Sequence, residues 1–439
     1  MKCTDMEKSS FSPFTACGVG VLVAGFVSAG QAQEIVQTIE RAPQSVFDTE
    51  RDEALAKFLD LGPISVRPHL YIDAYYDDNV SLRRSHKQED FVWHIAPGAL
   101  FGAGEFRGDK GTYVSLDYTM RGSIYPKHDG YDSLDHDVIM SGGWKLSKLT
   151  LGLSQAYEIE NGKQVEVGAF VEEEAYTTLL TSKYELSDKT FFELNGRQSL
   201  ICSKVRILDA PDFKLNAINE WLAEAWGGYK ATEKITAGVG GTIGWRDIRG
   251  FANGATSAEV TPNETFEQAL VRASYRATEK LDLNGSAGLQ FSQFQDGDDK
   301  GPSLVFTLGG SWQPLERTSV SLEGYRRDVP SFGLNGQNYT LTGTRASVRQ
   351  LFLEKYTLSL SGGYENSHYT KNSSSVSGGS PTYDYFWIRP GLDYQFNERW
   401  VTGLFYQYRT KNSNLNSTSL DLNHDYSNNQ VGIYSSYRF

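Results

Sequence analysis

The chain has 439 residues and a formal net charge of −12, with 42 lysine and arginine residues against 54 aspartate and glutamate residues. No basic patch or phosphate-binding loop is present, so a nucleic-acid partner is excluded. Glycine (43), tyrosine (25) and phenylalanine (23) are abundant and methionine (4) is rare, a composition typical of strands, turns and interfacial aromatic belts. A secreted β-sandwich could share this composition, and strand length must separate the two classes.

Residues 1–32 have the pattern of a signal peptide. Lys2 and Lys8 precede an apolar run at residues 17–29, and small residues three apart follow in Gly30-Gln31-Ala32. This run is too short for a spanning helix, and no other stretch approaches the ~20 apolar residues that such a helix needs. The pattern therefore predicts export from the cytoplasm and excludes a helical membrane protein.

Residues 33–62 precede the first predicted strand and are expected to form a partly helical periplasmic segment. Residues 48–53 are rich in acidic residues and offer a capping hydroxyl or carboxylate where a helix would begin, and Gly62-Pro63 would end it. The apolar residues Leu55, Phe58 and Leu59 would share one face. The segment is interpreted either as a short arm against the mouth of the following domain or as a docking or plugging element.

Long alternating strands characterise residues 63–439. In residues 235–245 the odd positions are apolar while the even positions are small or polar, and residues 281–291 and 386–396 alternate in the same way with the opposite face polar. Strands of transmembrane barrels alternate over ~10 residues, whereas strands of soluble sandwiches usually have about five or six. The fold class predicted here is all-β, a transmembrane antiparallel β-barrel in the cell outer membrane.

Short turns and longer polar segments alternate along this region. The predicted periplasmic turns lie at residues 107–110, 146–148, 187–189, 231–234, 277–280, 314–317, 353–355 and 396–399. The predicted external loops lie near residues 77–89, 124–136, 160–170, 203–217, 247–263, 293–303, 328–338, 368–382 and 410–425. With both ends of the chain in the periplasm, these predict about 18 strands, with 16 as the alternative. None of the external segments is long enough to suggest a deep constriction loop.

The last strand, residues 431–439, alternates in the same way. Phe439 and Tyr437 share the predicted lipid face, with Arg438 and Ser436 on the other. A strand that ends on an aromatic residue looks like the closing strand of a bacterial outer-membrane barrel. Phe439 and Tyr437 are therefore the predicted assembly signal, read by the barrel assembly machinery.

Several segments together resemble the β-barrel porin 2 family. They are residues 70–80, 95–98, 389–394, 400, 406–409, 412–414 and 426–432 and the ending Tyr437-Arg438-Phe439. Each is a loose motif, and their order over nearly the whole mature chain carries the resemblance. Members of that family often belong to exopolysaccharide or capsule export systems, and some look like 18-stranded polysaccharide export porins. The resemblance thus implies export of a surface polysaccharide, with periplasmic polysaccharide export proteins as partners.

Strand alternation also assigns side chains to the lumen, which is water-filled in a barrel of this size. The inward arginines of the second half are Arg246, Arg272, Arg276, Arg327, Arg345, Arg349, Arg389, Arg409 and Arg438, against the acids Asp282, Glu323, Glu365 and Asp393. This net basic wall favours anions. The alternative is that loop acids pair with these arginines, which then only stiffen the wall.

Four inward aromatic residues are candidates for stacking on sugar rings: Tyr325, Tyr385, Trp387 and Tyr434. Aromatic side chains in a lumen can instead belong to the interface girdles or pack beneath a loop.

Catalytic and metal-binding patterns are weak. No Gly-x-Ser-x-Gly elbow is present, the histidines lack zinc-ligand spacing, and the Asp-rich residues 296–301 lack the distal glutamate of a calcium loop. We expect no enzyme activity, no cofactor and no metal site.

Two classes of function follow from the sequence. The first is a porin-like channel, either for export of a surface exopolysaccharide or for general or anion-preferring diffusion. The second is a structural or adhesive barrel with a blocked lumen. Outer-membrane lipid and lipopolysaccharide are expected partners in both.

Overall fold

The computed structural model describes residues 59–104, 111–207, 212–250, 263–295, 299–334, 336–372, 380–414 and 425–438. The predicted signal peptide, most of the segment 33–62 and Phe439 lie outside these ranges. Within the described ranges, no helix is long and apolar enough to cross a membrane.

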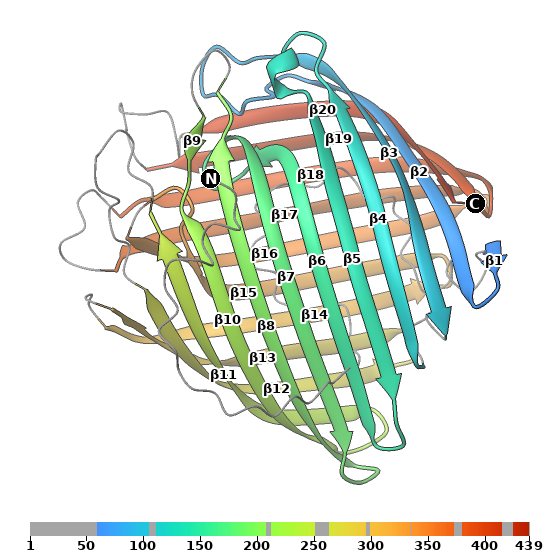
Figure 1. Cartoon of the computed structure of the whole chain (residues 1–439), viewed down its shortest axis with the longest axis vertical. Coiled ribbons are helices and arrows are strands. Elements are labelled where there is room, and N and C mark those ends of the chain that lie inside the picture. Colours follow the sequence, from blue (N-terminus) through green and yellow to red (C-terminus); the bar gives the residue numbers. More distant parts are fainter. Residues whose placement is uncertain are drawn as a thin grey trace.

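The chain folds into one closed antiparallel barrel (Figure 1). Of the 20 strands in the sheet, β1 (Leu59–Leu61) and β9 (Phe213–Lys214) are short additions, and the other 18 form the wall. The wall strands are β2 (Ile64–Asp77), β3 (Asp90–Gly104), β4 (Tyr113–Ile124), β5 (Ser133–Lys145), β6 (Leu149–Gln164), β7 (Ala169–Glu185), β8 (Thr190–Val205), β10 (Ala217–Lys230), β11 (Ile235–Arg249), β12 (Glu264–Thr278), β13 (Leu281–Phe294), β14 (Lys300–Leu315), β15 (Thr318–Pro330), β16 (Gln337–Phe352), β17 (Tyr356–Lys371), β18 (Thr382–Asn397), β19 (Trp400–Ser413) and β20 (Tyr426–Arg438). Closure joins β2 to β20, with Leu70 opposite Tyr437 and Asp77 opposite Gln430. The predicted fold class and the 18-strand count are confirmed.

Large apolar side chains cover the outside of the barrel. Val239, Ile243 and Val271 are 66%, 66% and 58% exposed, although a water-soluble protein would bury such side chains. An outward apolar band with polar residues on the inner face is the pattern of a barrel that crosses the outer membrane. The protein is therefore an outer-membrane β-barrel.

Aromatic rings form a continuous belt at the turn end of strands β16–β19. Successive ring centroids lie 5.5 Å apart for Phe352 and Tyr356, 4.9 Å for Tyr356 and Tyr394, and 4.7 Å for Tyr394 and Phe396. Phe396 in turn stacks on Trp400 at 4.5 Å. Such rings place one membrane boundary at this end of the barrel.

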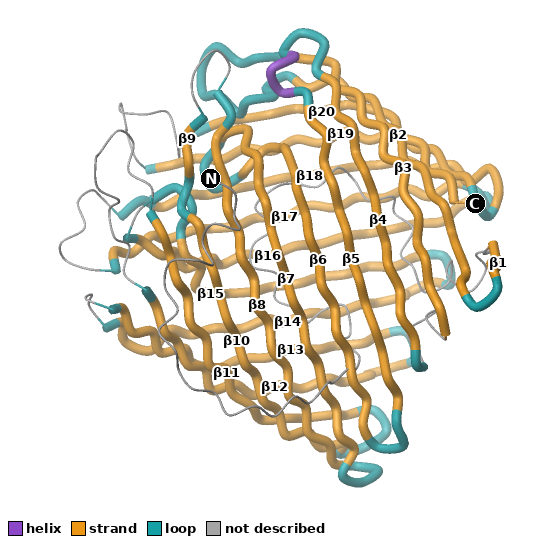
Figure 2. Tube along the Cα trace, viewed as in Figure 1, coloured by secondary structure: helices purple, strands orange, loops and turns teal. Residues whose placement is uncertain are grey.

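The two ends of the barrel differ as predicted. Tight turns such as residues 231–234 and 398–399 join strands at one end, and longer connections such as residues 78–89 join them at the other (Figure 2). The start of β2 and the end of β20 lie at the turn end, since His69 pairs with Arg438. The turn end is the periplasmic side in this class, and the loop end is external.

Two sequence expectations need correction. Leu59, expected on a helix, belongs to strand β1, which pairs with residues 64–66 of β2. The pairing of β20 with β2 reaches only His69, so β1 satisfies backbone groups of β2 that β20 leaves open. The second correction concerns the loop predicted near residues 160–170. There β6 and β7 continue as a paired hairpin to Gln164 and Ala169, which leaves residues 165–168 as the connection.

Candidate functional site

The inner wall over β10–β12 is built in layers. An added Cβ at Gly240 would lie 2.4 Å from the Trp226 ring, and one at Gly244 would lie 2.1 Å from the Phe266 ring, so only glycine lets these rings lie flat. The guanidinium group of an arginine lies over each of these two rings. The Arg272 guanidinium carbon is 4.3 Å from the Trp226 ring centre, within the range of cation–π attraction.

Arg246 completes the second stack and joins three strands. Its guanidinium carbon is 4.3 Å from the Phe266 ring centre, and it bonds Glu220 on β10 at 2.6 Å and Glu264 on β12 at 2.8 Å. The side chains of Arg246, Glu220 and Glu264 are 8%, 2% and 0% exposed. Glu220 accepts a further hydrogen bond from Arg197 at 2.6 Å. A charge network as buried as this one holds the wall together and exposes little charge to a passing ion.

The predicted arginines all lie on inward faces, but they separate into two groups. Arg246, Arg272 and Arg409 are covered, with Arg272 paired to Glu193 and Arg409 donating to Asn428 at 2.8 Å. Arg389 donates to Gln407 at 3.1 Å. The partners are residues of other wall strands and not the loop acids of the stated alternative, but they likewise fix part of the arginine set within the wall.

The second group is more open to the lumen. The Arg276 side chain is 67% exposed and lies 3.4 Å from Asp282, and that of Arg345 is 46% exposed and lies 3.1 Å from Glu365. Arg349 is half-buried. These arginines remain the candidates for acting on a solute. Arg327 lies over the Tyr325 ring at 5.2 Å, and Arg438 is half-buried at the end of β20.

The four aromatic residues proposed for sugar stacking also face inward. Tyr325, Tyr385 and Tyr434 are only 4%, 6% and 4% exposed, and Trp387 is half-buried. Tyr325 donates to Glu365 and Tyr434 donates to Asp393. Burial of these rings agrees with the alternative that they pack within the wall. Sugar stacking remains a prediction, and in this state the three tyrosine rings offer almost no open face.

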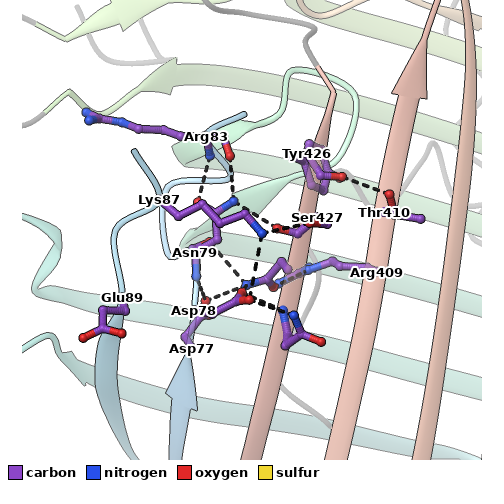
Figure 3. A network of polar contacts seen from close by, with 12 residues as sticks. Asp77, Asp78, Asn79, Arg83, Lys87, Glu89, Arg409, Thr410, Tyr426 and Ser427 are labelled. Atoms are coloured by element: carbon purple, nitrogen blue, oxygen red, sulfur yellow. Dashed lines mark hydrogen bonds and ion pairs between the residues drawn. The ribbon is translucent and has the colours of Figure 1, made fainter. Parts of the chain in front are cut away.

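A polar network closes the external end of the seam between the first and last wall strands (Figure 3). Asn428 donates to Asp77 at 2.6 Å, and the Asn429 side chain donates to Asp78 at 2.7 Å. Asn79 donates to the Ser427 carbonyl at 3.1 Å. These residues thus have a structural role in joining the two ends of the barrel wall.

The hairpin tip between β6 and β7, residues 160–170, leaves the wall and enters the mouth. Pairing of β5 with β6 ends at His136 and Ile159, whereas β6 and β7 stay paired to Gln164 and Ala169. Inside the mouth, Lys163 forms an ion pair with Asp77 of β2, and it lies 3.4 Å from Asn428 of β20. The seam network is thus also the anchor of the tip.

Apolar contacts hold both sides of the tip. Val167 is fully buried in a cluster with Ile218 of β10 and Phe332 of the β15–β16 loop. Phe170 stacks on Tyr131 at 4.5 Å and meets the edge of Tyr125 at 5.7 Å. A connection that lay outside the barrel in water would not bury these side chains, so they position the tip within the mouth.

At the end of the tip, Glu166 reaches the β15–β16 loop. Its carboxylate accepts hydrogen bonds from the Ser331 hydroxyl at 2.5 Å, the Phe332 amide at 3.2 Å and the Gly333 amide at 3.3 Å. Lys411 of β19 donates to the carbonyl of Glu166. We call residues 331–333 the nest and their contact with Glu166 the latch. Burial raises the pKa of the Glu166 carboxyl, against the lowering effect of these hydrogen bonds.

The latch joins opposite sides of the barrel. Strands β8 and β10–β14 separate the β6–β7 hairpin from the β15–β16 hairpin in one direction, and strands β17–β20 and β2–β5 separate them in the other. The two hairpins therefore bend toward each other and bridge the external mouth.

This bridge was not predicted from the sequence, because none of the predicted external loops is long enough to suggest a constriction. The bend depends on a tight turn, in which Gly168 has a φ of +69° and donates to the Gln164 carbonyl at 2.9 Å. A usable sign was present in the sequence. Two valines, an alanine and a phenylalanine fall within residues 165–170, which belong to the segment expected to be a polar external loop.

Among the described residues, no group of three or more histidine, cysteine, aspartate or glutamate side chains is placed to hold a metal ion.

No protein-family model matches the sequence, and no curated protein matches it. Several solved structures resemble this chain at low similarity. The apoprotein form of the FrpB iron transporter from Neisseria meningitidis (F5-1 variant) aligns with 88% of this chain and 83% of its own, at 10% identity and a TM-score of 0.45. OpdQ from Pseudomonas aeruginosa aligns with 86% of this chain and 99% of its own, at 11% identity and a TM-score of 0.42. OccK3 (OpdO) from the same organism aligns with 85% and 95%, at 13% identity and a TM-score of 0.42.

These similarities concern the fold alone. Independently of them, a closed wall of 18 strands with a polar inner face has the architecture of an outer-membrane porin-like channel. The resemblance to the β-barrel porin 2 family stays a prediction.

Proposed function

We propose that this protein is an outer-membrane channel that exports a surface exopolysaccharide and opens only when its cargo arrives. The observation that carries the proposal is the latch, which bridges the external mouth between opposite walls. A diffusion porin needs at most a narrowed mouth, whereas a bridge anchored on both walls must be released before a polymer can pass. Such a bridge suits an export channel, because a wide permanent opening would admit harmful solutes.

The resemblance to the β-barrel porin 2 family supports the same proposal, and periplasmic polysaccharide export proteins would then deliver the polymer to the turn end. A hydrated polymer also suits an inner face rich in hydroxyl, amide and paired charged groups, such as Ser321 and Ser347, whose hydroxyls lie 2.7 Å apart.

The second candidate is an anion-preferring diffusion porin. It is favoured by one observation, the exposed Arg276 and Arg345 side chains on the inner face. In this case the latch would narrow the mouth without closing it.

Conductance in planar bilayers tests these candidates together. We compare the wild type with a variant that carries Lys163→Met and Glu166→Gln, which removes the ion pair to Asp77 and the charge in the nest. The export proposal expects low conductance in the wild type and a severalfold larger conductance in the variant. Equal, porin-like conductance in both proteins favours the diffusion porin. No conductance in either protein favours a structural barrel with a blocked lumen.

Secretion by cells separates export from gated diffusion. A strain that lacks the protein should lose its surface polysaccharide, and the wild-type gene should restore it. Normal polysaccharide export in the deletion strain would reject the export proposal even if the barrel conducts.

A further inference from the structure

The nest has the form of a receptor for a carboxylate. Two successive backbone amides, of Phe332 and Gly333, and the Ser331 hydroxyl converge on one carboxylate group. Converging amides of this kind form concave sites for anions, and hydrogen bonds to a charged acceptor are stronger than neutral ones.

The nest is held in shape by contacts of its own loop. The Ser331 hydroxyl oxygen accepts the Leu334 amide at 2.8 Å, and the Ser331 amide donates to the Gln337 carbonyl at 3.1 Å. Asn216, from the connection that precedes β10, donates to the Ser331 carbonyl at 2.8 Å. These contacts do not involve Glu166, so the donors should keep their positions when the carboxylate leaves.

The carboxylate in the nest belongs to another part of the barrel. Glu166 is 165 residues away in the sequence and arrives on the opposite hairpin. The Lys411 ammonium contacts the Glu166 carbonyl, so the hydrogen bonds to the carboxylate itself come from neutral donors. A free carboxylate could make the same three hydrogen bonds.

We propose that residues 331–333 form a binding site for the carboxylate groups of an acidic polysaccharide, and that Glu166 occupies this site in the resting channel. A uronate group of the polymer replaces Glu166 in the nest, and the β6–β7 tip is then released from the mouth. This inference rests on the proposed export function and adds the substrate class to it.

The ligand must carry many carboxylates to compete. A tethered group such as Glu166 acts at an effective concentration of roughly millimolar. A single sugar acid at micromolar concentration cannot displace it, whereas a polyuronate in the lumen presents a series of carboxylates at a high local concentration. A neutral polymer offers the nest no charge.

Release of the tip can be measured without relying on conductance. Lys163 is 6% exposed in the latched state, so trypsin should cut after Lys163 only when the tip is released. Full-length protein in lipid vesicles is treated with trypsin in the presence of a polyuronate oligosaccharide, glucuronic acid or a neutral dextran of equal length. The polyuronate should accelerate this cleavage by about tenfold, as expected when charge-assisted hydrogen bonds are exchanged, and the other two should not.

Variants connect the effect to the nest. Glu166→Gln places an amide donor among donors and should be cut rapidly without any polymer. Ser331→Ala removes a donor to Glu166 and to the polymer alike, so its cleavage without polymer should exceed that of the wild type, and polyuronate should add little to it. Ser347→Ala removes a lumen hydroxyl that is remote from the nest and should respond like the wild type.

Four outcomes are possible. Equal cleavage with polyuronate and dextran overturns the proposal, and so does a Ser331→Ala variant with the wild-type response. Polyuronate-dependent cleavage that Ser331→Ala abolishes supports it. If that dependence holds while Glu166→Gln conducts nothing in bilayers, the nest is a carboxylate site and the channel function fails separately.

Discussion

Removal of the Arg246 guanidinium should destabilise the barrel strongly, because the charge it neutralises is buried. Arg246 bonds Glu220 at 2.6 Å and Glu264 at 2.8 Å, and all three side chains are at most 8% exposed. In Arg246→Met, Glu220 keeps its contact with Arg197, but Glu264 retains only the Asn338 amide at 2.8 Å. Loss of one partner from a buried pair lowers the free energy of unfolding by about 3–5 kcal/mol.

Arg276→Met provides the matched control. Arg276 pairs with Asp282 at 3.4 Å on the same inner face, but its side chain is 67% exposed. Exposed pairs contribute only about 0–1 kcal/mol. The two substitutions thus remove the same group and should differ by at least about 30-fold in the folding equilibrium constant, since about 1.4 kcal/mol corresponds to tenfold.

The assay is urea unfolding in lipid vesicles, followed by tryptophan fluorescence and by the heat-modifiable mobility of the folded barrel on gels. Arg246→Met should unfold at a clearly lower urea concentration than the wild type, with Arg276→Met close to the wild type. Addition of Glu264→Gln to Arg246→Met should restore part of the loss, because the unpaired charge disappears. Equal unfolding midpoints for the two single variants would show that the Arg246 network does not stabilise the barrel.

Other consequences of the structure can be checked in the same preparations. Charge reversal of Arg345 and Arg349 to glutamate changes the inner wall by four charge units, two at each position. The reversal potential of the open channel should shift toward cation preference, because these side chains act on ions within a Debye length of ~8 Å. An unchanged reversal potential would show that neither side chain faces the ion path. Gly244→Ala should assemble poorly, because its new Cβ would lie 2.1 Å from the Phe266 ring on the neighbouring strand. Gly301→Ala is the control and should assemble normally, because no atom lies within 4 Å of its new Cβ. Equal yields of folded barrel for the two variants would contradict the layered packing of the wall.

The alternation of side chains along the sequence determines much of this protein by itself. A strand has a period of two, so the apolar residues of segments such as 235–245 identify the lipid face, and Arg246 and Arg345 fall on the opposite face. Short turns and longer loops also follow from local sequence. The antiparallel barrel of 18 strands, its orientation and the inward direction of the arginines were therefore predictable from the sequence. The two-residue period of a strand does not show which of the inward charged side chains form ion pairs.

Contacts between distant segments were decided only by the tertiary structure. Arg272 reaches Glu193 three strands away, because the small Gly238 on the intervening strand β11 lets its side chain lie against the wall. The latch brings Glu166 to Ser331 across 165 residues, because two hairpins bend inward and meet. Such contacts depend on how far a hairpin leaves the wall and where the closed barrel places the opposite strand. The alternation of residues along a strand determines neither quantity. The sequence therefore predicts the wall of the channel, whereas only the tertiary structure shows how the external mouth is bridged.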